Sequence, residues 1–246
     1  MMGRSWSAGR LAGAILLLAA HLGAQVGTDV GTAAAGELHS TYLDPQIVGL
    51  ERVLPPPPEA GSPEARADLA AVVAAIAART PADERRIVEN LPCTLDRFAA
   101  VLGPRFTAAR MPLTAALIER VFQDGERIVL AAKSRVARPR PYSLEPTLAT
   151  FGHRSDSTAY PSGHATFGYL AATVLAALVP ARRDALFRHA GAYGRNRMIA
   201  GTHFPSDLEA GRISAAVIAA SLFRDPDFAR DLATARAEMD RVAAEP

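Results

Sequence analysis

Cysteine is almost absent from this sequence: Cys93 is the only one, so no disulfide bond can form within the chain. An excess of charge of one sign is also absent, because 27 basic and 25 acidic side chains are interspersed and leave a formal net charge of +2. The sequence therefore has neither the basic stripe of a nucleic-acid-binding protein nor a polybasic membrane patch. The fold must be held by packing, and any role of the cations must be local.

Sustained alternation of polar and apolar residues, which is typical of half-buried strands, is absent as well. From Ser62 onward the pattern is helical almost throughout, and its Ser-Pro-Glu start is typical of a helix N-terminus. We expect helices at 62–79, 94–102, 106–111, 113–136, 162–179, 182–200, 206–223 and 226–243, and a short helix that begins at residue 80. The ranges 106–111 and 113–136 form either two helices or one continuous helix. With 246 residues, the chain is predicted to form one all-α domain.

The run 163–179 contains no Asp, Glu, Lys or Arg, which also suits a transmembrane helix. However, it begins with a polar Ser-Gly-His turn, ends before Pro180 and is rich in alanine. We therefore predict a buried central helix, with the helix at 206–223 packed against it.

The N-terminal segment 1–24 is typical of a secretory signal peptide. Arg4 and Arg10 provide its positive region, and 11–20 is an uncharged, largely apolar core that is too short to span a bilayer comfortably. Cleavage is expected after Ala24 or in the alanine run 33–35, and an uncleaved anchor is the alternative. The pattern predicts a periplasmic or secreted protein without stable membrane insertion after cleavage.

Residues 25–60 show little periodicity and include four consecutive prolines at 55–58. These prolines favour an extended, polyproline-like arm that wraps the domain or contacts a second subunit. A disordered leader is the alternative, and for 25–36 it is the favoured one. The helical domain is predicted to occupy 61–246.

Three polar motifs follow one another in the helical region. In the last of them, His203 comes six positions after Arg197, and Asp207 comes four positions after His203. A helix is expected to end at Gly201 and the next to begin at Pro205, so His203 lies in a tight turn. Asp207 can then reach one ring nitrogen of His203 and fix its tautomer. Taken alone, a solvated surface turn explains the motif equally well.

The middle motif, 161–164, opens the helix predicted at 162–179. Ser162 is suited to cap that helix, and the amides of Gly163 and His164 form an anion site at the positive end of its dipole. His164 is placed there for acid chemistry on a bound oxyanion.

The first motif contains Lys133 and Arg140 with six residues between them. By itself it is better explained as the basic, solvated end of a helix that prolines interrupt. Together, however, the three motifs supply three cations, a hydroxyl group, helix-terminal amides, two histidines and one aspartate. This inventory matches what phosphoryl transfer without a metal requires.

In this order, the three motifs resemble the signature of the type 2 phosphatidic acid phosphatase superfamily. The intervals between them, 19 residues (142–160) and 31 residues (165–195), are of the size that this family uses. The proline run 55–58 and its distance from Lys133 are similar to the class A bacterial non-specific acid phosphatases. Membrane members of the superfamily need several spans, and this chain has no set of six apolar runs.

The resemblance covers about residues 40–223 and implies a single helical domain of the acid phosphatase/vanadium haloperoxidase type. It implies hydrolysis of phosphomonoesters at acid pH through a phosphohistidine intermediate. In this comparison His203 is the nucleophile, Asp207 orients it, and His164 protonates the leaving oxygen and later activates water. The groups expected to bind the phosphate oxygens are Lys133, Arg140, Ser162, Gly163 and Arg197.

Arg138 introduces an ambiguity, since it also precedes a proline, but only Arg140 keeps the signature's interval from Lys133. Asn196 stands where the signature usually has serine, and it is predicted to support the site without binding phosphate. His153 lies in the loop before the middle motif and receives no role.

No metal or other cofactor is expected, because the histidines and carboxylates form no recognisable ligand set and three cations already do a metal's work. The expected partners are small-molecule phosphomonoesters and not nucleic acid, and the resemblance also implies self-association. Since His164 must begin protonated, and histidine has a reference pKa of about 6.5, activity is expected on the acid side of neutral.

Two alternatives have different functions. Vanadium haloperoxidases are oxidoreductases that hold vanadate with the same cations and a histidine, but they are usually longer, and the proline run favours the phosphatases. A non-catalytic phosphate-binding relative would keep the fold. The joint presence of His203, Asp207 and His164 argues against it.

Overall fold

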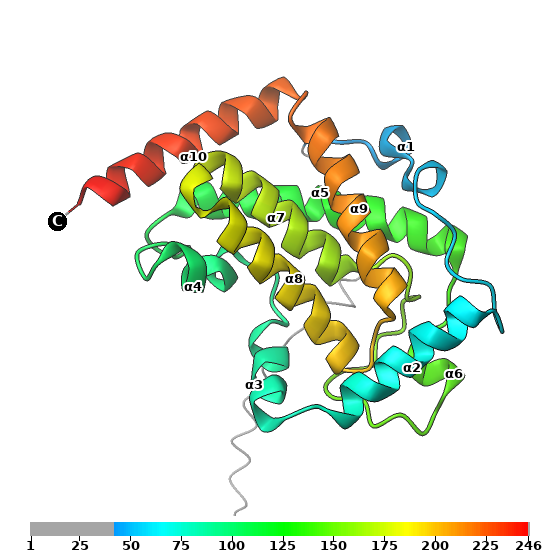
Figure 1. The fold of residues 1–246 in the computed structure, drawn as a ribbon. Helices are drawn as coiled ribbons and strands as arrows, with labels where there is room; N and C mark the ends of the chain where they lie inside the picture. Colours follow the sequence, from blue (N-terminus) through cyan, green and yellow to red (C-terminus); the bar gives the residue numbers. More distant parts are fainter. Residues whose placement is uncertain (1–41, 246) are drawn as a thin grey trace, which may run out of the picture.

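The computed structural model describes residues 42–245, which form α-helices and short 3₁₀-helices with no strand among them (Figure 1). The α-helices are α1 (Pro45–Val48), α2 (Pro63–Ala77), α3 (Pro81–Glu89), α4 (Ala99–Leu102), α5 (Pro112–Val136), α6 (Pro141–Leu144), α7 (Gly163–Leu178), α8 (Arg183–Ile199), α9 (Pro205–Leu222) and α10 (Pro226–Ala244). The 3₁₀-helices are η1 (Leu50–Arg52), η2 (Leu95–Phe98) and η3 (Pro180–Arg182). The all-α prediction is confirmed. The signal peptide predicted at 1–24 lies outside the described residues.

The prediction of a helix at 106–111 is wrong, because this stretch forms turns. The carboxylate of Asp96 accepts a hydrogen bond from the backbone N–H of Ala108 at 2.8 Å, which stabilises the turn. Met111 has φ −129° and ψ 62°, since the residue before a proline is disfavoured in the helical region. A new helix, α5, begins at Pro112 instead.

The described part of the predicted arm, residues 42–60, is not extended throughout. Asp44 caps α1 by accepting the N–H of Gln46, and Gly49 ends that helix with φ +50°, in the left-handed region. The proline run 55–58 is free of helix, as expected. The described part of the arm therefore contains a helical turn, which the local capping residues explain.

The first described residues of the arm, 42 and 43, are fixed to the domain by α5 and α10. Asp124 of α5 is fully buried and accepts the backbone N–H groups of Tyr42 and Leu43, at 2.8 and 3.1 Å. The Tyr42 hydroxyl donates to Asp231 of α10 at 2.6 Å. These contacts place residues 42–43 against the helical domain.

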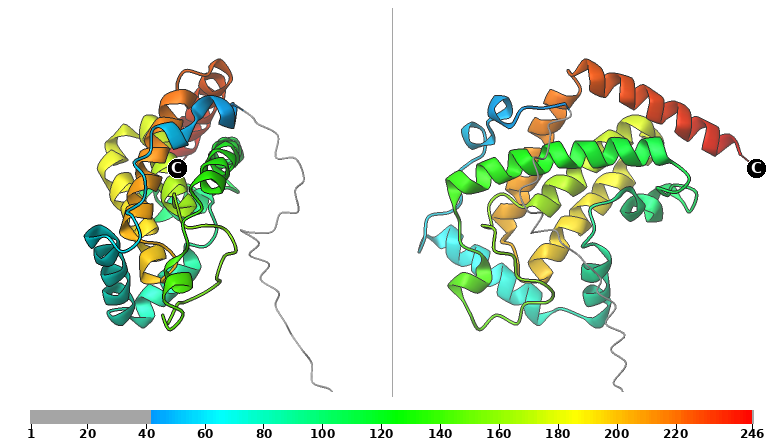
Figure 2. Two further views of the ribbon diagram at one scale, coloured as in Figure 1. Left: turned by 90° about the vertical axis from the view of Figure 1, so that its right-hand side faces the viewer. Right: turned by 180° about the vertical axis from the view of Figure 1, so that it is seen from behind.

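Helix α7 lies at the centre of the bundle, with α8, α9 and α5 packed around it (Figures 1 and 2). Leu170, Val174 and Leu175 are among its many buried residues, and Gly168 lets α8 approach closely, since a Cβ there would lie 3.4 Å from the carbonyl oxygen of Ala190. As predicted, the run 163–179 is a central helix buried against α9. Within residues 42–245, no helix is long and apolar enough to cross a membrane.

The N-terminal turns of α7 and α9 touch each other. A Cβ at Gly211 would lie only 2.7 Å from both the carbonyl oxygen of Ser162 and the Cβ of Ala165, so this approach requires glycine. The backbone N–H of Ser162 also donates to the carbonyl oxygen of Asp207 at 3.0 Å. The two helix starts are therefore held in a fixed relation.

The three sequence motifs occupy helix ends that meet in one region. Lys133 lies in the last turn of α5, Ser162 caps α7, Arg197 lies in the last turn of α8, and Asp207 lies in the first turn of α9. After α5, Ala137 adopts φ +48°, in the left-handed region, and this turn directs the following segment towards the site. The N-terminal ends of α7 and α9, which carry positive partial charge, therefore lie side by side.

Candidate active site

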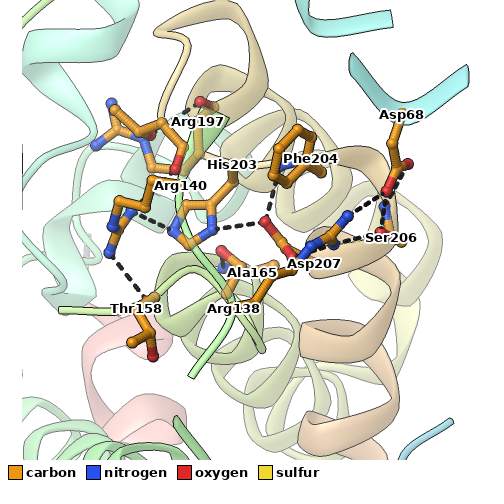
Figure 3. Close-up of polar contacts among 12 residues, drawn as sticks. Asp68, Arg138, Arg140, Thr158, Ala165, Arg197, His203, Phe204, Ser206 and Asp207 are labelled. Atoms are coloured by element: carbon orange, nitrogen blue, oxygen red, sulfur yellow. Dashed lines mark hydrogen bonds and ion pairs between the residues drawn. The ribbon is translucent and has the colours of Figure 1, made fainter. Parts of the chain in front are cut away.

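His203 lies in the turn between α8 and α9 that the sequence predicts. Helix α8 ends at Ile199, and Gly201 has φ +78°, which reverses the chain direction. His203 is buried, with 4% of the residue's surface exposed. Its Nδ1 lies 3.4 Å from Oδ2 of Asp207, and its Nε2 lies 3.1 Å from Nη1 of Arg140 (Figure 3).

These two contacts determine which nitrogen of His203 carries the proton. A guanidinium group can only donate, so Nε2 must accept the hydrogen bond from Arg140. The proton then resides on Nδ1 and is donated to the carboxylate of Asp207. The same oxygen, Oδ2, also accepts the N–H of Phe204 at 2.8 Å. The structure thus leaves a lone pair on Nε2, which a nucleophilic histidine requires.

Burial, followed by the charges of Arg140, Lys133 and Arg197, lowers the pKa of His203 well below its ordinary value. These three cations therefore lie near the imidazole, and each is less than a tenth exposed. Within residues 42–245, no carboxylate lies at ion-pair distance from any of them, and their partners are mostly backbone carbonyls. Arg140 donates to the carbonyl oxygens of Ser157 at 2.6 Å and Thr202 at 2.9 Å, and Lys133 donates to that of Thr158.

The guanidinium of Arg197 has a donor that the described part of the chain leaves unsatisfied. Its Nε is buried and has no hydrogen-bond partner there. A buried cation without a countercharge is costly, and an unsatisfied buried donor adds to that cost. The three cations therefore form a site that favours a bound anion with several acceptor oxygens.

The pKa values of these cations reflect their burial without carboxylate partners. Burial, and then the nearby Arg140, lower the pKa of Lys133 to about 7. Burial likewise lowers the pKa of Arg140 and that of Arg197. An anion bound between the three groups would raise all three values, because it favours their charged forms.

Ser162 and Gly163 lie at the start of α7. The Ser162 hydroxyl accepts the N–H of Ala165 at 3.3 Å, as expected of a capping residue, and among residues 42–245 it donates no hydrogen bond of its own. Apart from the two neighbouring residues and the backbone of its own helix, no atom of the described chain lies within 4 Å of the position that a Cβ of Gly163 would take. A ligand oxygen can therefore approach this backbone closely, at the positive end of the helix dipole.

His164 lies in the first turn of α7, but it is held by a segment that the sequence motifs do not include. Its Nε2 lies 3.3 Å from the carbonyl oxygen of Leu91, and its ring stacks on Tyr193 with centroids 5.8 Å apart. Since a carbonyl only accepts, Nε2 is the donor and Nδ1 holds the remaining lone pair. Burial, followed by Arg197 and His203, lowers the pKa of His164 well below its ordinary value.

Arg138 and Arg140, the two arginines of the first motif that precede a proline, take different places in the structure. Arg140 contacts His203, whereas Nη1 of Arg138 lies 2.6 Å from Oδ1 of Asp207, on the side away from the imidazole (Figure 3). Arg138 also contacts Asp68 of α2 at 2.8 Å. The sequence motifs do not indicate Asp68, which comes 70 residues before Arg138.

Two further residues are placed by the structure. His153 is exposed in the loop before α7, and within residues 42–245 no hydrogen bond or ion pair joins it to the motif residues. Asn196 is buried on α8, and within residues 42–245 no hydrogen bond joins its side chain to the motif residues.

Among residues 42–245, no group of three or more His, Cys, Asp or Glu side chains is arranged to hold a metal ion.

Comparison with known proteins gives matches across this region. The PAP2 superfamily profile matches residues 112–231. A non-specific acid phosphatase of Salmonella typhimurium is 31% identical over 210 residues, which cover 79% of this chain and 82% of that protein. An acid phosphatase of Zymomonas mobilis is 31% identical over 157 residues, 62% of this chain and 60% of the other. A transmembrane PAP2 type phosphatidylglycerolphosphate phosphatase from Bacillus subtilis aligns with a TM-score of 0.47 at 20% identity, over 71% of this chain and 88% of that one.

Proposed function

This chain belongs to the PAP2 superfamily, among the class A non-specific acid phosphatases, and on that premise we propose that it hydrolyses phosphomonoesters at acid pH without a metal, through a phosphohistidine on His203. One observation carries the proposal. Nε2 of His203 has its lone pair directed at Arg140, beside the buried cations Lys133 and Arg197 that lack carboxylate partners among residues 42–245. The names of the relatives favour phosphatase chemistry over a vanadium haloperoxidase.

In the first step, the substrate's phosphate group enters the cation site. Lys133, Arg140 and Arg197 bind its non-bridging oxygens, with the Ser162 hydroxyl and the Gly163 amide completing the set. Arg140 now donates to phosphate, so Nε2 of His203 becomes available. Nε2 attacks phosphorus, the bond to the ester oxygen breaks, and His164 gives a proton to the departing oxygen.

In the second step, His164, now neutral, accepts a proton from a water molecule. That water attacks phosphorus, the N–P bond breaks, and inorganic phosphate leaves while His203 recovers its lone pair. The imidazole of the intermediate carries positive charge, which the carboxylate of Asp207 stabilises through the proton on Nδ1. No step needs a metal, because the three cations neutralise the phosphate oxygens.

The pKa shifts predict how hydrolysis depends on pH. The pKa of Lys133 is lowered to about 7, so its charge is complete in acid and is lost as the pH rises through that value. Because the pKa of His164 is lowered, His164 loses its proton at a lower pH than Lys133 does, unless bound phosphate retains that proton. We expect kcat/KM for a chromogenic phosphomonoester to be highest near about pH 5 and to fall above about pH 7.

The assay that tests the proposed function measures this profile with and without a chelator, with vanadate as an inhibitor. We expect full activity in the chelator and competitive inhibition by vanadate, which mimics phosphate. Complete loss of activity on chelation that returns when a metal is added would contradict the metal-independent mechanism.

A second prediction concerns His164. We expect His164→Ala to lower kcat by about 10²-fold to 10⁴-fold for alkyl phosphates, and much less for nitrophenyl phosphates, because only poor leaving groups need the proton. Exposed His153 gives the matched control, and His153→Ala should keep wild-type kcat for both substrates. An equal loss for all leaving groups would show that His164 is not the acid.

The sequence further supports a location and a set of partners. We propose that 1–24 is a signal peptide, that 25–60 is an arm preceding the helical domain at 61–246, and that the mature protein acts in the periplasm or outside the cell. Its substrates are small phosphomonoesters, and it associates with itself.

A further inference from the structure

A buried group of charges lies behind Asp207, on the side away from His203. Nη1 of Arg138 contacts Oδ1 of Asp207 at 2.6 Å, and Nη2 contacts Oδ2 of Asp68 at 2.8 Å (Figure 3). Arg138 and Asp68 are each 8% exposed, and Asp207 is 0% exposed. Neither Arg138 nor Asp68 touches His203, so the mechanism above does not use them directly.

We propose that Arg138, held by Asp68, is a positioning residue that fixes the carboxylate of Asp207 for its contact with His203. This inference rests on the proposed role of His203. Arg138 occupies Oδ1, and consequently Oδ2 is the oxygen that faces Nδ1 of His203 and the N–H of Phe204. The imidazole is thereby held in the tautomer that leaves Nε2 unprotonated.

The contacts of Arg138 fix its guanidinium plane from several sides. Nη1 also donates to Oγ of Ser206 at 2.7 Å, and the guanidinium carbon lies 4.2 Å from the ring centroid of Phe204. Ser206 in turn donates to Asp68 through both its hydroxyl and its backbone N–H. A planar fork can bind two carboxylates in fixed directions, which the single ammonium of lysine cannot reproduce.

Asp68 connects this group to a helix outside the three motifs. It lies on α2, and its bond to the N–H of Ser206 satisfies a donor in the first turn of α9. Asp68 of α2 therefore holds two groups in place: the start of α9, which carries Asp207, and the guanidinium of Arg138.

The charge of Arg138 also opposes the effect of burial on the pKa of Asp207. Burial raises the pKa of the Asp207 carboxyl, and Arg138 is the largest of the groups that lower it. Without Arg138, Asp207 would take up a proton at a higher pH and lose the negative charge that stabilises the phosphohistidine. The other charged or titratable groups that face Asp207 are His203, Lys133, Arg140 and Tyr160.

The test compares Arg138→Met with Arg140→Met and with Arg212→Met, an arginine on the outer face of α9 paired with Glu209. We expect Arg138→Met to lower kcat by about 10-fold to 100-fold, the range for groups that orient a reactive side chain from behind. Its inhibition constant for inorganic phosphate should stay within about twofold of wild type, because Arg138 does not touch the substrate. Arg140→Met should weaken phosphate inhibition strongly, and Arg212→Met should change neither quantity.

The pH profile separates positioning from a purely structural role. In Arg138→Met the acidic side of the kcat profile should move to higher pH, because the pKa of Asp207 rises. Arg138→Lys retains the charge but not the fork, so its kcat should fall with a smaller movement of the profile. If Arg138→Met does not fold, Arg138→Lys and Asp68→Asn must show the lowered kcat with unchanged phosphate inhibition.

Two outcomes would overturn the inference: a folded Arg138→Met with wild-type kcat and profile, or phosphate inhibition weakened as much as in Arg140→Met. The wild-type protein is measured in the same series. Its failure to hydrolyse phosphomonoesters would contradict the proposed function itself, which distinguishes that result from a failure of the Arg138 inference alone.

Discussion

His203→Ala is expected to lower kcat for phosphomonoesters by about 10⁴-fold or more, since removal of a nucleophile eliminates the covalent route. The reason lies in the two contacts of the imidazole. Asp207 holds the Nδ1 proton, and Arg140 shows that Nε2 carries the lone pair. Steady-state kinetics with a chromogenic substrate, at enzyme concentrations high enough to detect slow turnover, measure the loss.

Phosphate binding provides the internal control for this variant. Lys133, Arg140 and Arg197 remain in His203→Ala, so vanadate or inorganic phosphate should still bind to the folded protein. Isothermal titration measures this binding without any turnover. A His203→Ala protein that binds phosphate and retains kcat within about tenfold of wild type would show that another group attacks phosphorus.

Arg197→Lys is expected to lower kcat/KM by about 10²-fold to 10³-fold, the range for loss of one donor to a developing oxyanion. The guanidinium of Arg197 is buried, and its Nε has no partner in the described chain, so its donors are available to phosphate. Lysine keeps the charge but loses the planar, multi-donor geometry. Kinetics on a single chromogenic phosphomonoester are sufficient for the measurement.

The neighbouring residue supplies the matched control for Arg197→Lys. Asn196 is buried on the same helix, but the residue before Arg197 points about 100° away from it around the helix axis. Asn196→Ser should therefore keep near-normal turnover. If Asn196→Ser proved as damaging as Arg197→Lys, Asn196 would contact the substrate and the set of phosphate-binding groups would be incomplete.

The sequence predicts much of this site because its groups lie at helix ends that have local signals. Gly201 and Pro205 mark the turn that holds His203, and Ser162 marks the start of α7. The first turn of α9 then brings Asp207 within reach of His203, which lies four positions earlier, just before the N-cap of the helix. The helices α5 and α7 to α10 were likewise predicted to within two residues, because their patterns are long.

The groups that support the site from outside the motifs could not be predicted. Asp68 is one of many acidic residues on helical surfaces, and only tertiary packing brings it to Arg138. His164 is held by the carbonyl oxygen of Leu91, and every residue type offers such an acceptor. The turns at 106–111 were missed because the side chain of Asp96 satisfies a backbone N–H there that a helix would otherwise bond.

The covalent intermediate is the most direct test of the mechanism. Wild-type protein, His164→Ala and His203→Ala are mixed with a ³²P-labelled phosphomonoester, quenched within the first turnover, digested and mapped. The account predicts label on the peptide that contains His203 in the wild type, more of it in His164→Ala when the substrate has a good leaving group, and none in His203→Ala. Label that persists in His203→Ala, or that maps to another residue in the wild type, would contradict it.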